Sequence, residues 1–186
     1  MPLQVQIAQT SDVTSLSVQA LIVPIVSWED YTSQVHELLR ARTNGYYHEL
    51  LGNLMRHGLH TTLPVILFKD DRPARVSQLE YVAFVFMDEH LDEPYVAYQR
   101  ALRLLSKEGV TTMAMGIPID VRSSESYVAD LKRLRYALEI QRLVAPHDIA
   151  RLLLAVDCGE AMHLAAQNLN HLQCANAKYR KGIIYS

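Results

Sequence analysis

Long apolar runs are missing from this sequence, since none approaches the roughly 20 residues that a membrane-spanning helix requires. No charged segment followed by an apolar one opens the chain, so we expect neither a secretory signal nor a membrane partner. Cys158 and Cys174 are too few for a disulfide framework and favour a reducing, cytoplasmic location. Basic residues do not exceed acidic ones, 18 against 20, which excludes a broad basic surface for duplex nucleic acid.

Apolar residues are plentiful, at 49% of 186 residues, and this content excludes disorder over most of the chain. The length suits one hydrophobic core rather than two. We therefore predict a single domain over residues 1–175. The remaining segment, 176–186, is polar and basic, and we expect it to be mobile or to dock on a partner.

Strands are indicated by short apolar runs. The alternation of Leu3, Val5 and Ile7 with glutamines predicts a half-buried strand. Continuous runs predict strands buried on both faces, and we expect Pro24 to end or bulge the first of them. These runs cover residues 18–26, 63–68, 81–87, 110–119 and 151–156.

Helices are indicated between these runs by apolar residues at helical spacing. Asn44 and Gly45 divide the first helical region into two helices, and Gly58 and Gly109 follow helices as stop signals. The helical regions are 29–58, 95–108, 124–144 and the segment around 161–172. Strands that alternate with helices predict an α/β fold, a three-layer α/β/α sandwich with a mixed sheet.

Three segments resemble the macro domain. The turn Ser11-Asp12-Val13-Thr14 before a strand is similar to the family's Gly-Asp-Ile-Thr turn. Residues 101–119 look like its helix–Gly–strand segment, and 151–170 look like its closing strand and helix. The resemblance covers most of residues 3–172. The macro-like N-terminal domain of leucine aminopeptidases shares this chain order, so the sequence resembles both families.

The resemblance implies a binding module for ADP-ribose or a related nucleotide. In binding members the carboxylate that matches Asp12 accepts a hydrogen bond from the adenine amino group, and Val13 lies beside it. The structural alternative is that Asp12 only stabilises a turn, which aspartate favours because its side chain accepts hydrogen bonds from nearby backbone N–H groups. The family's Asn-Ala-Ala-Asn is replaced by residues 23–26, Val-Pro-Ile-Val, and neither expected ligand loop contains glycine. These losses predict that hydrolase activity is absent.

Two strand-to-helix loops complete the expected ligand site. A helix start offers unpaired N–H groups to an anion, although Ser123 or Ser124 also suits a helix N-cap and Trp28 also suits core packing. Arg122 can neutralise a phosphate or remain solvated. The candidate residues in these loops are Ser27, Trp28, Arg122, Ser123, Ser124 and Glu125.

Three functions stay open: nucleotide binding, a degenerate domain that serves as an interaction scaffold, and a hydrolase with a substituted base. The substitute would be Glu29, Asp30 or Glu125. We expect no cofactor and no metal, because Gly58 breaks the helix between His57 and His60. The excess of tyrosine over phenylalanine, 10 against 3, predicts a homodimer or protein-partner interface.

Overall fold

The apolar runs form one sheet in the computed structural model, which describes residues 3–25, 34–57, 63–71, 78–87, 95–116, 124–144, 148–172 and 184–185. Its strands stand in the order β3-β4-β2-β5-β6-β1-β7. They are β1 (Gln4–Gln9), β2 (Ala20–Ile25), β3 (Val65–Lys69), β4 (Tyr81–Phe86), β5 (Thr112–Gly116), β6 (Arg151–Val156) and β7 (Ile184–Tyr185). The five central strands are parallel, and β3 and β7 run antiparallel at the two edges. The predicted mixed sheet is confirmed.

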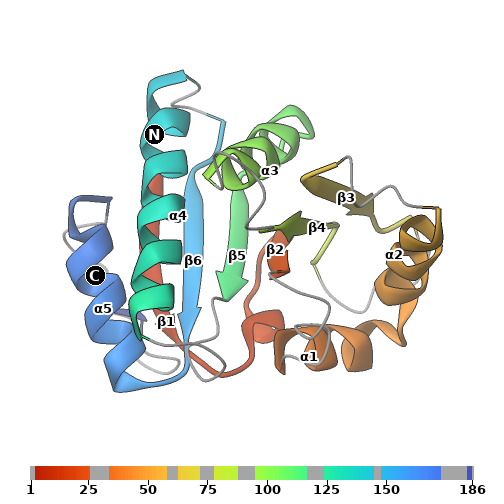
Figure 1. Ribbon diagram of the computed structural model, residues 1–186, viewed down its shortest axis with the longest axis horizontal. Coiled ribbons are helices and arrows are strands. Elements are labelled where there is room, and N and C mark those ends of the chain that lie inside the picture. The colour runs from red at the N-terminus through yellow and green to blue at the C-terminus, as the bar shows by residue number, and fades with distance from the viewer. Residues whose placement is uncertain are drawn as a thin grey trace.

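Helices cover both faces of this sheet. They are α1 (Gln34–Thr43), α2 (Tyr46–Arg56), α3 (Tyr95–Lys107), α4 (Ser124–Val144) and α5 (Gly159–Leu169), with short 3₁₀ turns η1 (Val13–Ser15) and η4 (Asn170–Leu172). One core packs α3, α4 and α5 on one face, and a second packs α1 and α2 on the other. Figure 1 shows α4 and α5 over β1 and β6, with α1 and α2 at the β2, β4 and β3 end. The three-layer sandwich is therefore confirmed.

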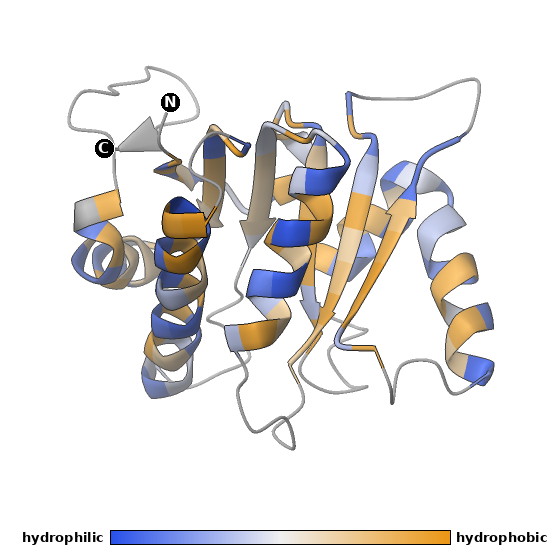
Figure 2. Cartoon of the chain, turned by 90° about the horizontal axis from the view of Figure 1, so that it is seen from above, coloured by the Kyte–Doolittle hydropathy of each residue, from blue (hydrophilic) through white to orange (hydrophobic). Residues whose placement is uncertain are grey.

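Apolar side chains explain this layering. Neighbouring strand residues point to opposite faces, so Ile22 belongs to the first core and Leu21 to the second. Both are buried, as expected for strands covered on both sides. Figure 2 shows strands that are apolar along much of their length and helices with apolar and polar stripes. In the described parts of the chain, no helix is both long and apolar enough to cross a bilayer.

Glycines end the helices where the sequence predicts. Asn44 and Gly45 adopt φ of 50° and 75° between α1 and α2, a left-handed conformation that interrupts the helix. Gly109 has the same conformation after α3, and its N–H donates to the carbonyl of Ser106. The stop signal expected at Gly58 lies outside the described residues.

Two expectations about strands are wrong. Strand β1 is not half-buried, because Gln6 is buried beside the buried Leu153 of β6. Alternation with a polar residue indicates a solvent-facing side only where that side stays uncovered. Pro24 does not end β2, which continues to Ile25. The β2–β5 ladder has already ended at Ile22, so the missing N–H of Pro24 interrupts no pair there.

The expected tail contributes a strand. Tyr185 and Ile184 of β7 pair antiparallel with Ile7 and Ala8 of β1. These tail residues therefore lie against the domain itself, on an edge that would otherwise be unpaired. The boundary at residue 175 stays a prediction.

Candidate functional site

The parallel strands all end on the same side of the sheet, called here its carboxyl edge, and the segments that follow these strands lie there. The η1 turn follows β1, α4 comes next in the chain after β5, and α5 follows β6. In open α/β sheets, ligands bind in the crevice outside the carboxyl ends of the strands. This edge is the candidate site, and it includes Asp12, Val13, Ser124 and Glu125 among the predicted residues.

Asp12 forms the N-cap of η1. Its Oδ1 accepts hydrogen bonds from the Thr14 N–H, at 3.0 Å, and from the Thr14 hydroxyl. The Asp12 N–H donates to the Thr10 hydroxyl, and the Ser15 hydroxyl donates to the Asp12 carbonyl at 2.6 Å. The turn interpretation of Asp12 is therefore confirmed, and the turn holds its carboxylate in one orientation.

The second carboxylate oxygen of Asp12 faces α1. The Arg42 Nη2 atom donates to Oδ2 at 2.7 Å, and both side chains remain partly exposed. Burial by itself would raise the pKa of Asp12, but hydrogen bonds from Thr14 and Arg42 and the charge of Arg42 lower it below 3.8. The carboxylate is thus ionised at neutral pH, with one oxygen fixed by the turn and one by a partly exposed guanidinium.

Val13 joins the turn to the sheet. Its side chain is buried, so only its backbone is left to touch a ligand. A Cβ added at Gly116 would lie 3.4 Å from Val35 Cγ2 and 3.8 Å from Val13 Cβ. The end of β5, the η1 turn and α1 are therefore in close contact, which fixes the position of Asp12.

Ser124 and Glu125 begin α4, and both are exposed. The Ser124 hydroxyl donates to Glu160 Oε1 at 2.7 Å, which joins the first turns of α4 and α5. With Asp157, also exposed, these residues make this part of the edge acidic. Carboxylates suit a helix start but repel a phosphate, so the described part of this edge is a poor phosphate site.

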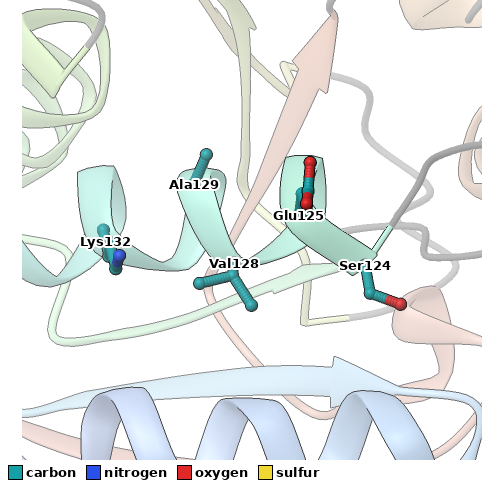
Figure 3. A pocket seen from close by; sticks show the side chains of 5 residues that line it. All are labelled: Ser124, Glu125, Val128, Ala129 and Lys132. Carbon is teal, nitrogen blue, oxygen red and sulfur yellow. The ribbon is translucent and has the colours of Figure 1, made fainter.

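An open hollow of about 370 Å³ lies against the first turns of α4. Figure 3 shows the described side chains that line it, all from this helix: Ser124, Glu125, Val128, Ala129 and Lys132. Val128 and Ala129 are its apolar lining residues. The predicted residues Ser27, Trp28, Arg122 and Ser123 lie outside the described residues, as do Glu29 and Asp30.

Cys158 is a free, half-buried thiol at the N-cap of α5, where its Sγ accepts from the Ala161 N–H at 3.5 Å. Nothing in the described residues pairs it with His163, whose Nε2 contacts Gln167 instead. Within the described ranges, no three His, Cys, Asp or Glu side chains are arranged to hold a metal.

Sequence reasoning did not find Arg42 as a site residue. Only its place in the last turn of α1 hints at a role, since basic residues suit helix C-termini. It also did not find that His36 Nδ1 and His48 Nε2 lie 3.2 Å apart in the core between α1 and α2. Both rings contact Phe84 of β4.

The buried His48 predicts sensitivity to acid. Burial, the charge of His36 and the charge of Arg40, in this order of size, together lower its pKa to about 4. Below pH 6.5 the imidazole of His48 is protonated in the unfolded chain but stays neutral in the folded protein. The free energy of unfolding therefore decreases as the pH is lowered from 6.5 to about 4. Urea unfolding at neutral pH and near pH 4.5 measures this loss.

The His48→Gln variant tests the assignment, because glutamine is polar and does not titrate. We expect its unfolding free energy to vary less over the same pH range than that of the parent protein. The exposed His163→Gln variant is the matched control and should keep the parent's pH dependence. Equal pH dependence in the parent and in His48→Gln would contradict the prediction.

Solved structures share this fold, although no protein-family model and no curated protein matches the sequence. A mutant of the Oceanobacillus iheyensis macrodomain superposes with a TM-score of 0.69 at 9% identity, over 90% of this chain and 92% of that one. The macro domain of ganglioside induced differentiation associated protein 2 gives 0.63 at 16% identity, over 91% and 83%. The Trypanosoma brucei macrodomain in complex with ADP-ribose gives 0.60 at 13% identity, over 88% and 68%.

Tomato leucine aminopeptidase also aligns, with a TM-score of 0.60 at 11% identity, over 89% of this chain but only 35% of that one. The chain therefore has the macro-domain fold, and the resemblance read from the sequence is confirmed at the level of the fold.

Proposed function

We propose that this protein binds ADP-ribose or a related nucleotide at the carboxyl edge of its sheet and does not hydrolyse it. The observation that carries the proposal is the Asp12 carboxylate, which the η1 turn orients at that edge. A macrodomain of the same fold is known in complex with ADP-ribose. The ionised carboxylate is an acceptor for the exocyclic amino group of adenine.

Arg42 does not prevent this role. Partly exposed ion pairs contribute about 0–1 kcal/mol, so a ligand amino group can replace Arg42 on Oδ2 at little cost. The acidic residues Glu125, Asp157 and Glu160 disfavour phosphates on the described part of the edge. We therefore assign most of the affinity to the adenosine part of the ligand.

The Asp12→Asn variant is the sharpest test. Asparagine is also a good N-cap, so the turn should persist, but the amide N–H placed at Oδ2 cannot accept from an amino group. Losing one charge-assisted hydrogen bond should weaken ADP-ribose binding about tenfold or more. Titration calorimetry with ADP-ribose and with AMP measures this loss, and circular dichroism checks the fold.

Two further variants serve as a control and as a second test of the site. Asp71 is exposed and follows β3. Because β3 runs antiparallel to β4, Asp71 lies on the side of the sheet opposite to the carboxyl edge, so Asp71→Asn should bind ADP-ribose like the parent. Arg42→Ala frees Oδ2 and should strengthen binding by up to about fivefold, which corresponds to the weak ion pair it removes. Equal affinities for Asp12→Asn and Asp71→Asn would rule out this site.

Interaction is a second candidate function, and a specific surface favours it. Three exposed large apolar side chains belong to α4, which is far from the Asp12 turn in the sequence. The predicted cytoplasmic location remains part of the proposal and rests on the cysteine content alone.

A further inference from the structure

The C-terminal half of α4 exposes large apolar side chains. Four such residues are exposed in the described ranges, and three of them belong to this helix: Tyr136 at 49%, Leu143 at 83% and Val144 at 65%. The fourth is Leu63, at 39%, beside β3. Tyr136 and Leu143 are seven residues apart, close to two whole helical turns, so they share one side of α4. Exposed apolar surface on a folded domain indicates a contact with another molecule.

The N-terminal half of the same helix lines an open hollow. Val128, Ala129, Glu125 and Lys132 are among the residues that line the hollow of about 370 Å³ (Figure 3). Apolar side chains are therefore accessible in both halves of α4.

Charged and apolar side chains share one stripe of this helix. Val128, Lys132, Glu139 and Leu143 occupy one stripe of α4, because their separations of four, seven and four residues are close to whole helical turns. Lys132 is exposed in the N-terminal half, and Glu139 lies in the C-terminal half, paired with Arg135 at 3.0 Å. The stripe carries opposite charges at mirrored positions.

We propose that α4 packs antiparallel against α4 of a second copy of this chain, about a two-fold axis that passes between Arg135 and Tyr136. This axis places Leu143 of each copy in the hollow over Val128 of the other. It also places Lys132 of each copy beside Glu139 of the other. An interface of this kind is isologous, since the same surface serves both copies.

The size of the contact sets its strength. A helix of 21 residues is about 31 Å long and about 10 Å wide, so α4 alone covers less than the about 800 Å² per partner of a standard interface. Tyr95 of α3 extends the apolar surface, because its ring packs edge-to-face on Tyr136 with centroids 4.6 Å apart. We expect a reversible dimer in the micromolar range, completed by the edges of α3 and α5.

Sedimentation velocity over a wide range of protein concentration tests the proposal. The parent protein should shift from monomer to dimer as concentration rises, and Leu143→Lys should weaken the dimer about tenfold or more. Leu63→Lys is the matched control, because it places the same charge on the exposed leucine outside α4, and it should dimerise like the parent. Circular dichroism confirms that each variant is folded.

Charge reversal tests whether the molecule that binds α4 is a second copy of this chain. Lys132→Glu and Glu139→Lys should each weaken the dimer, because each creates a like-charge pair across the axis. The protein that carries both changes should recover dimerisation, since opposite charges again face each other. A parent that stays monomeric at every concentration would overturn the proposal, as would a dimer that Leu143→Lys leaves intact or that fails to recover in the double variant.

Discussion

ADP-ribose release from mono-ADP-ribosylated protein is expected to be at least a hundredfold slower with this protein than with an active macro-type hydrolase. In the hydrolases that the sequence resembles, an asparagine stands at the end of the strand that corresponds to β2. Here the last residues of β2 are Val23, Pro24 and Ile25, and Val23 and Ile25 are buried. The residue expected in place of that asparagine is Val26, which lies outside the described residues. An aliphatic side chain neither orients water nor hydrogen-bonds a ribose, and Pro24 lacks an N–H.

The size of the expected loss follows from comparable chemistry. Removing one positioned hydrogen-bond donor from an oxyanion hole costs about 100- to 1,000-fold in rate. The assay is hydrolysis of a mono-ADP-ribosylated protein, with buffer as the blank. Turnover well above buffer would contradict the prediction. Loss of that turnover in Glu125→Ala, but not in Glu139→Ala on the same helix, would identify Glu125 as a substitute base.

Replacing Phe84 by alanine is expected to cost about 3–5 kcal/mol of unfolding free energy. The Phe84 side chain is fully buried in β4. Its ring lies parallel to His36 and edge-on to His48 and Phe68, each with centroids 5.9 Å apart. Truncation removes this apolar area and leaves a cavity that packed helices fill only in part.

The result also tests what anchors α1. His36 belongs to α1, which carries Arg42 to the Asp12 carboxylate, so Phe84 supports the helix that flanks the proposed site. Phe86→Ala is the matched control, because Phe86 is in the same strand but only half-buried. Urea denaturation gives both unfolding free energies. A loss for Phe84→Ala no larger than that for Phe86→Ala would contradict the packing argument.

The order of strands and helices could be predicted from the sequence because it depends on local properties. An apolar run such as Leu152 to Val156 favours a buried strand wherever it lies, and Gly45 and Gly109 end helices because few other residues adopt a positive φ. The turn at Asp12 is local too, since the carboxylate bonds a residue two positions away. These features fixed the fold class and one residue of the candidate site.

Only the tertiary structure decided the features that join distant segments. Arg42 lies 30 residues from the Asp12 that it pairs with, and nothing local to either predicts the pair. The burial of Gln6 depends on what packs against β1, and the exposure of Leu143 depends on which side of α4 faces the sheet. When both sides of a helix are apolar, the sequence pattern does not distinguish the apolar residues that will be buried from those that will be exposed. That distinction arises only when the helix is placed on the sheet.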